Sequence, residues 1–271
     1  MIKTGMAVIG LLFASGWAHA DDYPSPTNER VRLSIGAVRV STSTNVLLDS
    51  SIGLPGNAIN AEDTFGLSGS DFEAKFQIVV RAGERHRLRF DYFSLDRTGN
   101  TTLGANALPI VFKDVVFEQG DPIETNMSLR TLGISYEYSF IHRERFEVAA
   151  ALGLNDTDIS LRARVQTEFR HVDQREDQAG PLPTLGLDAT YVLSKRFYVD
   201  GRFQYMKASI DHLDGLLSFY EVSAQYRLRP NIAFALGYTS IKAYVDSRQP
   251  KDSGYFNFVT RGPEMFVRVA F

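Results

Sequence analysis

Few side chains in this sequence of 271 residues have the chemistry of a nucleophile or a general base, since it holds 5 histidines and no cysteine. The most suggestive group is Asp211-His212-Leu213-Asp214, because an aspartate beside a histidine can activate water. Asp156-Thr157-Asp158 offers a second pair of carboxylates, and Ser209 and Ser218 offer hydroxyls near His212. Neighbouring strand residues point to opposite faces, so only His212 and Asp214 would share a face. The pattern therefore predicts no catalytic residues and leaves a hydrolase at the rim as the least favoured alternative.

The other chemistry-bearing residues indicate no cofactor and no metal. His86 and His142 lie in short predicted turns among Arg and Glu, and His171 lies in a charged predicted loop. The absence of cysteine excludes disulfides, thiolate metal sites and a lipid-bearing cysteine. The acidic loop residues lack the spacing of a calcium-binding loop. We therefore predict no catalytic, cofactor-binding or metal site.

Composition excludes several classes of protein. The chain is 44% hydrophobic and 23% charged, with a mean hydropathy of -0.15, which is too polar for a bundle of membrane-spanning helices and too apolar for a disordered chain. The net charge of -3 and the pI near 6.0 give no basic footprint for nucleic acid. The length suits one globular unit or one barrel.

The N-terminus has the pattern of a secretory signal peptide. Lys3 precedes an apolar run at 6–17, and Ala18-His19-Ala20 supplies the small residues that a signal peptidase reads. About a dozen apolar residues are too few to span a bilayer. We predict a cleaved signal peptide at 1–20, a short flexible periplasmic lead-in at 21–30, and a transmembrane barrel at 31–271.

After residue 30 the sequence alternates between apolar and polar residues, which is the pattern of half-exposed strands. In the segment 71–81, for example, Phe72, Phe76 and Ile78 fall on one face, and Glu73, Lys75 and Gln77 on the other. We count ten apolar rows, at 31–37, 72–80, 88–92, 132–140, 146–154, 185–193, 197–205, 220–228, 232–238 and 265–271.

The links between these rows alternate in length. Tight links at 83–86, 142–145, 194–196 and 229–231 predict short turns on one rim, and the segments 41–70, 98–126, 155–180, 211–215 and 246–254 predict loops, mostly long, on the other. This arrangement is typical of a closed antiparallel transmembrane barrel with an even number of strands. Strand-like runs at 110–117 and 159–169 either extend hairpins above the membrane or make twelve strands; eight strands are a further alternative.

Two features favour a barrel with its apolar face toward lipid over a soluble periplasmic barrel. The polar rows mix charges of both signs with small residues, as a crowded lumen requires. Aromatic residues gather near both ends of the apolar rows, which predicts two interfacial girdles. The first lies toward the short turns, at Phe140, Phe146, Tyr191, Phe197, Tyr226, Phe234 and Phe271, and the second toward the long loops, at Tyr92, Tyr205, Tyr220 and Tyr238.

The inward rows predict a charge network inside the barrel. A barrel of ten strands is only slightly wider than one of eight, whose interior side chains fill. Charges of both signs in that space tend to pair, so we predict a largely filled lumen, with a narrow path for ions or small solutes as the alternative. The predicted lumen charges are Glu73, Lys75, Arg87, Arg89, Asp91, Asp200, Arg202, Glu221, Arg227 and Arg268.

The chain ends on Phe271, behind Met265, Val267 and Val269 at alternate positions. With the leader and the alternating rows, this ending resembles the bacterial outer-membrane β-barrel superfamily. In that superfamily a terminal aromatic residue is typically the signal read by the barrel assembly machinery. Through the run 85–93 (RHRLRFDYF) the chain also looks like a group of small proteobacterial outer-membrane proteins, which implies no activity. Asp156, Asp158 and Asp211-His212 superficially resemble the omptin proteases, although omptins need both members of the Asp-His pair to face the cleft.

The sequence therefore predicts an all-β protein, a single closed barrel in the outer membrane of a Gram-negative bacterium. We expect a non-enzymatic structural or surface-interaction role, with outer-membrane lipid, the barrel assembly machinery and an unknown extracellular ligand as partners, and without nucleic acid. A narrow, porin-like channel is the first alternative, and an omptin-like or lipid-modifying hydrolase at the rim is the second.

Overall fold

The computed structural model describes residues 25–48, 58–104, 110–112, 115–166, 171–210, 212–249 and 252–271. The predicted signal peptide at 1–20 and residues 21–24 of the lead-in lie outside these ranges.

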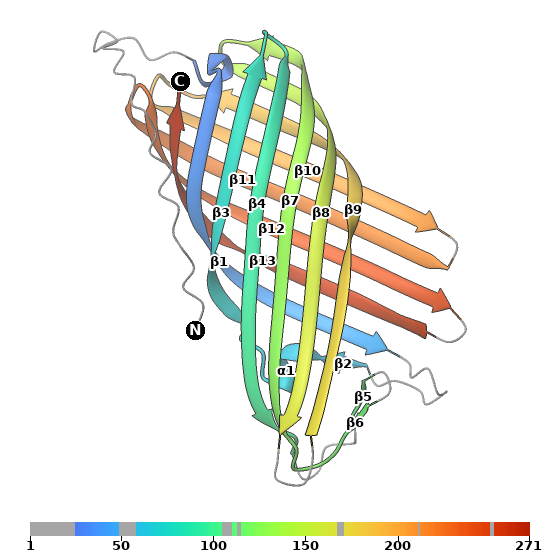
Figure 1. The fold of residues 1–271 in the computed structure, drawn as a ribbon. Coiled ribbons are helices and arrows are strands. Elements are labelled where there is room, and N and C mark those ends of the chain that lie inside the picture. Colours follow the sequence, from blue (N-terminus) through green and yellow to red (C-terminus); the bar gives the residue numbers. More distant parts are fainter. Residues whose placement is uncertain are drawn as a thin grey trace.

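Ten antiparallel strands form a closed barrel (Figure 1). Each strand pairs with the next along the chain, and β13 pairs with β1 to close the sheet. The ten predicted strands are confirmed, and the alternatives of eight and twelve are wrong. The strands are β1 (Val31–Leu48), β3 (Ser70–Ala82), β4 (His86–Thr102), β7 (Pro122–Arg143), β8 (Phe146–Gln166), β9 (His171–Val192), β10 (Phe197–Ile210), β11 (Leu213–Arg229), β12 (Ile232–Gln249) and β13 (Asp252–Ala270).

The four predicted short turns lie together at one end of the barrel, at the top of Figure 1. The chain terminus closes the sheet at this same end, where the Val31 carbonyl accepts a bond from the Phe271 amide at 2.9 Å. Closure matters because a bilayer offers no partner for free backbone groups at a sheet edge.

Parts of every predicted loop are strand, which corrects the sequence prediction. β1 continues to Leu48, β4 to Thr102 and β8 to Gln166, while β7 begins at Pro122 and β9 at His171. The run predicted at 159–169 extends β8 as far as Gln166, and the run at 110–117 forms a separate hairpin of β5 (Ile110–Phe112) and β6 (Val115–Phe117). Polar composition was misleading here because both the outer surface and the strand ends face water.

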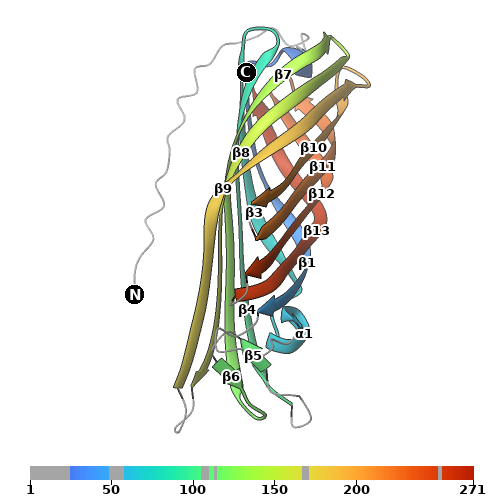
Figure 2. The same ribbon diagram turned by 90° about the vertical axis from the view of Figure 1, so that its right-hand side faces the viewer.

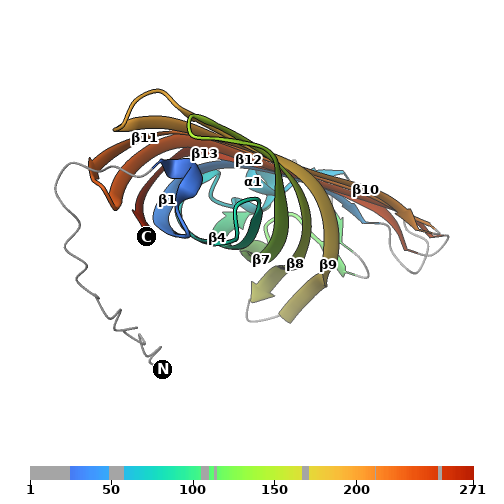
Figure 3. The same cartoon turned by 90° about the horizontal axis from the view of Figure 1, so that it is seen from above.

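Short elements occupy the end opposite the turns. β2 (Ile59–Asn60) leads into α1 (Ala61–Phe65), which lies inside the ring of strands seen in Figure 3. α1 packs closely on β4 because Gly99 has no Cβ; a Cβ there would lie 2.6 Å from the Phe65 carbonyl oxygen. Arg97 of β4 also anchors the segment, donating to Glu62 at 2.7 Å and to the Ser68 carbonyl at 2.6 Å.

A belt of exposed apolar side chains surrounds the half of the barrel nearest the turns. On β7, for example, Leu132, Ile134, Tyr136, Tyr138 and Phe140 all face outward. About ten tilted residues cover the apolar thickness of a bilayer, so these rows are long enough to span it. Every residue of the two predicted aromatic girdles is exposed on this belt. We call this part of the barrel the membrane half, and the remainder the outer half.

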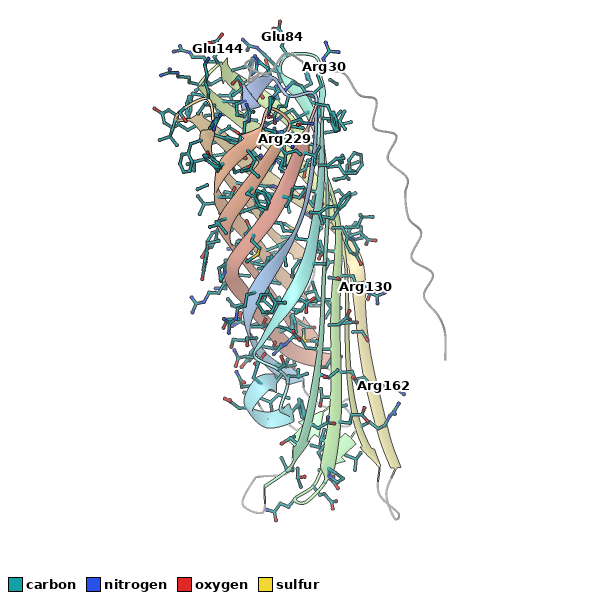
Figure 4. All side chains as sticks on the ribbon, turned by 90° about the vertical axis from the view of Figure 1, so that its left-hand side faces the viewer. Arg30, Glu84, Arg130, Glu144, Arg162 and Arg229 are labelled. Atoms are coloured by element: carbon teal, nitrogen blue, oxygen red, sulfur yellow. The ribbon has the colours of Figure 1, made fainter. Side chains whose placement is uncertain are left out.

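The outer half has the opposite pattern. The same strands continue without a break in alternation, but here most of their buried, inward residues are apolar, with Thr44, Arg97 and Thr125 as polar exceptions. Examples are Val40 on β1, Leu129 on β7, Leu161 on β8 and Phe258 on β13, which pack into one cluster with Phe65 of α1. The outward residues are polar, as Arg130 and Arg162 in Figure 4 show. None of the helices among the described residues is long and apolar enough to cross a membrane.

Candidate functional site

Sixteen charged side chains fill the lumen of the membrane half, and we call them the lumen charge network. Each lies within 4.0 Å of an opposite charge, and their side chains are largely buried. The signs balance, with eight cations and eight anions. They are Arg32, Lys75, Arg81, Arg87, Arg89, Arg202, Arg227 and Arg268, with Glu29, Asp91, Glu137, Glu147, Asp188, Asp200, Glu221 and Glu264.

Glu137 on β7 and Glu147 on β8 are the centres of one cluster. Arg87 lies 2.8 Å from Glu137 and 3.0 Å from Glu147, which also receives Arg81 at 2.8 Å. Arg89 bridges Glu137 at 2.5 Å and Asp188 of β9 at 2.8 Å. Five strands are thus joined through a few shared carboxylates.

Other pairs cross the barrel. Lys75 of β3 donates to Glu221 of β11 at 2.5 Å and to Glu264 of β13 at 2.9 Å. Arg202 of β10 lies 2.8 Å from Asp91 of β4. Lys75–Glu221 and Arg202–Asp91 each join strands four places apart in the ring of ten, so these two pairs cross the lumen, whereas Glu264 lies on the same side of the barrel as Lys75, two strands away.

The lead-in closes the end nearest the turns. Residues 25–30 were predicted to be flexible, but Pro26–Asn28 forms a short 3-10 turn whose Thr27 is fully buried. Glu29 is buried against Arg227 and lies 3.9 Å from Arg32. Nearby, Arg268 pairs with Asp200 at 2.7 Å. The segment is ordered because its carboxylate has cationic partners inside the barrel.

The structure places nine of the ten predicted lumen charges in this network. Glu73 differs: it is buried on the inward face of β3, but no cation pairs with it among the described residues. The members that were not predicted as site residues include Glu137, Glu147, Asp188 and Glu264, all at inward positions beside outward apolar residues. Assigning every second residue of each strand to the lumen would have predicted these four residues from the sequence.

Little space remains among these charges. One cavity beside Lys75 and Glu264 measures about 10 Å³, and another beside Arg32, Asp188 and Asp200 measures about 20 Å³. A water molecule needs roughly 10–15 Å³ of such space, so each cavity has room for about one. The membrane half is therefore filled with paired charges.

The outer half contains a much larger cavity, of about 170 Å³. Its walls are mostly apolar and come from β1, β4, β7, β8 and β9–β13, whereas its floor includes Lys75, Asp91 and Arg202 of the lumen charge network. The cavity of the outer half and the charged lumen of the membrane half therefore meet at the layer that contains these three side chains.

The residues considered for hydrolysis do not converge. Asp156 and Asp158 are exposed on the outward face of β8, and His212 is exposed in the turn between β10 and β11. Ser209 donates to Asp214 at 2.5 Å, and Asp211 lies outside the described residues. His142 lies 3.2 Å from Glu147, and His86 contacts the Tyr136 hydroxyl at 2.6 Å. Within the described ranges, no group of three His, Cys, Asp or Glu residues is arranged to hold a metal.

The C-terminal row is on the lipid side of the barrel. Met265, Val267 and Phe271 are exposed, and Val269 is half-buried between Leu33 of β1 and Ile232 of β12. The Phe271 carbonyl also accepts bonds from the Arg30 and Val31 amides, so this end of the chain completes the barrel.

Comparison with known proteins identifies the fold. No protein-family model and no curated protein matches the sequence. Among solved structures, the outer membrane protease OmpT from Escherichia coli aligns with a TM-score of 0.57 at 10% identity, covering 93% of this chain and 99% of OmpT. The fold is that of an outer-membrane β-barrel. The translocator domain of the autotransporter NalP from Neisseria meningitidis gives a TM-score of 0.47 at 10% identity, covering 89% of both chains. The attachment invasion locus protein Ail of Yersinia pestis gives 0.32 at 8% identity, covering 87% of this chain and 98% of Ail. At these identities the likeness extends to the fold alone.

Proposed function

We propose that this protein is a closed, non-conducting barrel of the Gram-negative outer membrane, with a non-enzymatic role at the cell surface. The apolar belt and the fold support this location. The observation that carries the proposal is the balanced lumen charge network, in which two cavities beside the charged side chains measure about 10 and 20 Å³.

The network opposes conduction for two reasons. A permeating ion would have to displace paired side chains, and removing one partner of a buried pair typically costs about 3–5 kcal/mol. A selective pore also needs a surplus of one sign along its path. The lumen charge network instead balances eight cations against eight anions.

The outer half supports a role in surface interaction. β7, β8 and β9 continue well beyond the apolar belt, and the outward side chains described on β7 and β8 are mostly polar there. Arg130 and Arg162 project from this wall (Figure 4). A rigid wall that extends past the membrane presents a surface to extracellular ligands.

The C-terminal row supports a role for the barrel assembly machinery as a partner during biogenesis. Met265, Val267, Val269 and Phe271 form the final strand row, and three of them are exposed on the belt. We expect the assembly machinery to bind this row before the barrel closes.

Planar-bilayer recording tests the proposed closure. The wild-type protein should give no current steps, and neither should Arg130→Ala, a control on the outer surface. The double variant Arg89→Ala/Glu137→Ala removes one charge of each sign from the centre of the network, so it should open discrete steps. Steps of similar size in wild type and double variant would contradict the proposal and establish the narrow channel.

A further inference from the structure

We propose that the cavity of the outer half binds a compact, uncharged, apolar molecule about the size of one substituted aromatic ring, which enters sideways between β9 and β10. This inference does not depend on closure of the lumen charge network, because binding and conduction are measured separately.

The walls of the cavity favour an apolar ligand. Its volume is about 170 Å³, and most of its lining comes from aliphatic and aromatic side chains, including Leu129, Leu217, Ile241, Phe256 and Phe258. A water molecule needs two to four polar partners, and apolar cavities of roughly 150 Å³ stay dry and take up benzene. The size and chemistry of this cavity therefore match a single ring.

The charged floor does not require a charged ligand. Lys75 and Arg202 already pair with Glu221, Glu264 and Asp91. Both cations also lie over the ring of Phe219, with Lys75 Nζ at 5.6 Å and Arg202 Cζ at 5.2 Å from its centroid. Because their charges are already satisfied, the ligand needs no counter-charge.

The wall of the barrel opens on one side of this cavity. β9 and β10 pair from Val192 with Tyr198 up to Leu185 with Tyr205, and the described residues show no further pair between them. Beyond that point β9 stays paired with β8 as far as His171, and β10 stays paired with β11 as far as Ile210. Figure 2 shows the two strands diverging.

Two prolines explain the opening. The Val192 amide donates toward β8, to the Arg145 carbonyl, and the Leu193 amide donates toward β10, to the Phe197 carbonyl. Since β9 has no register shift in either pairing, its odd-numbered residues direct their backbone groups toward β10. Pro181 and Pro183 occupy the next two odd positions after Leu185 and have no N–H to donate.

The opening leads into the cavity at the level of the membrane surface. Leu182 of β9 and Met206 of β10 lie just past the last pair, on the two sides of the gap, and both line the cavity. Leu185 and Tyr205 are the last members of the apolar belt on these strands. An apolar molecule concentrated at the outer interface would therefore meet the entrance directly.

Photolabelling of the full barrel in lipid nanodiscs tests the site. The probe is 3-trifluoromethyl-3-phenyldiazirine, which is apolar and contains one ring, with benzene and the polar ring pyrazine as competitors. Labelled peptides are mapped by mass spectrometry. Peptides bearing Leu129 and Phe258 should be labelled saturably and protected by benzene but not by pyrazine, whereas the lipid-facing Ile134 and Leu236 should show unsaturable labelling.

A matched pair of variants separates the cavity from the lipid. Ala243 lines the cavity, and Lys242 beside it is exposed. Ala243→Phe should reduce cavity labelling by about tenfold or more because the added ring occupies the space. Lys242→Phe should leave that labelling unchanged, and heat-modifiable gel mobility checks that both variants fold. Labelling confined to lipid-facing residues, or equal labelling in both variants, would overturn the site.

The entrance has its own test. Pro181→Val/Pro183→Val restores two N–H donors on the side of β9 that faces β10, which should narrow the gap. Exchange of the same probe between the cavity and the lipid, measured from 19F line shapes, should then slow by about tenfold. The fraction of barrels that hold the probe should stay the same. Unchanged exchange would overturn entry through the gap. Labelling of the cavity in lipid-free amphipol but not in nanodiscs would overturn the single-ring ligand and identify a lipid acyl chain as the occupant of the cavity.

Discussion

The two ends of β7 share one alternation but have opposite chemistry. In the membrane half, Leu132 to Phe140 face outward in alternation with Gly133, Ser135, Glu137 and Ser139 inside. In the outer half, the even-numbered residues from Glu124 to Arg130 face outward, and the inward residues are buried and apolar (Ile123, Met127 and Leu129) except for Thr125. The surroundings decide which face is apolar: hydrocarbon outside favours polar residues within, and water outside favours an apolar interior.

Because the chemistry of the two faces is exchanged between the membrane half and the outer half, the two interiors leave different amounts of free space. The charged interior is nearly filled, with cavities of about 10 and 20 Å³, while the apolar interior keeps a cavity of about 170 Å³. Charged pairs are tied to one geometry by their partners, which leaves little free space. An apolar lining requires no partners and can enclose an empty cavity.

The largest expected effect comes from breaking the network. Glu137→Leu leaves Arg87 and Arg89 without their shared carboxylate, so the free energy of unfolding should fall by about 3–5 kcal/mol. Urea titration in lipid vesicles, followed by gel mobility, measures the change. Arg130→Ala, on the exposed outer face of the same strand, is the control and should change it by less than about 0.5 kcal/mol. Equal losses in both variants would mean that the network is not the stabilising element.

A charge placed on the outward face compares the two halves directly. Ile134→Arg should cost about 2–4 kcal/mol because it faces hydrocarbon. Asn126→Arg, on the same face of β7 in the outer half, should cost less than about 0.5 kcal/mol because it faces water. The same urea titration measures both variants. A similar loss of unfolding free energy at both positions would contradict the proposed boundary between the membrane half and the outer half.

The prolines of β9 allow a smaller test within the outer half. Restoring N–H donors with Pro181→Val/Pro183→Val should extend pairing to β10 and slow amide hydrogen exchange at 206–210. Each new hydrogen bond contributes about 0.5–1.5 kcal/mol. Exchange that stays as fast as in wild type would show that the prolines do not hold the gap open.

The smallest effect is expected at the outer rim. His212→Ala removes an exposed turn side chain, so the unfolding free energy should change by less than about 0.5 kcal/mol. Cleavage of a peptide library by the wild-type protein, lost in this variant, would instead favour the hydrolase alternative.

The membrane half could be predicted from the sequence almost residue by residue. Its period-two rows and aromatic ends reflect one physical demand, an apolar surface toward lipid, which acts on every strand in the same way. Nine of the ten predicted lumen charges lie in the network for the same reason. Glu73 departs from this pattern because it lies near the outer end of β3.

The outer half was harder to predict because its strands exchange the chemistry of their faces. The segment 155–180 was assigned as a loop that a strand-like run interrupts at 159–169, and in that run Leu161, Ala163 and Val165 alternate with polar residues. In this part of the strand the apolar residues face the interior and the polar residues face outward, which is the reverse of the membrane half. Pro181 and Pro183 indicate from the sequence alone that two backbone donors are missing from this strand, since proline has no N–H. Which neighbouring strand loses those hydrogen bonds could be assigned only from the register of β9 with β8.

The most direct test of the inversion is a nitroxide scan along the outward face of β7 in lipid bilayers, at even positions from 124 to 140. The ratio of collision rates with oxygen and with a water-soluble nickel complex reports lipid or water at each site. We predict water from Glu124 to Arg130 and lipid from Leu132 to Phe140, with the change between Arg130 and Leu132. A uniform environment along the strand, or protein-buried labels at Leu132 to Phe140, would contradict the account.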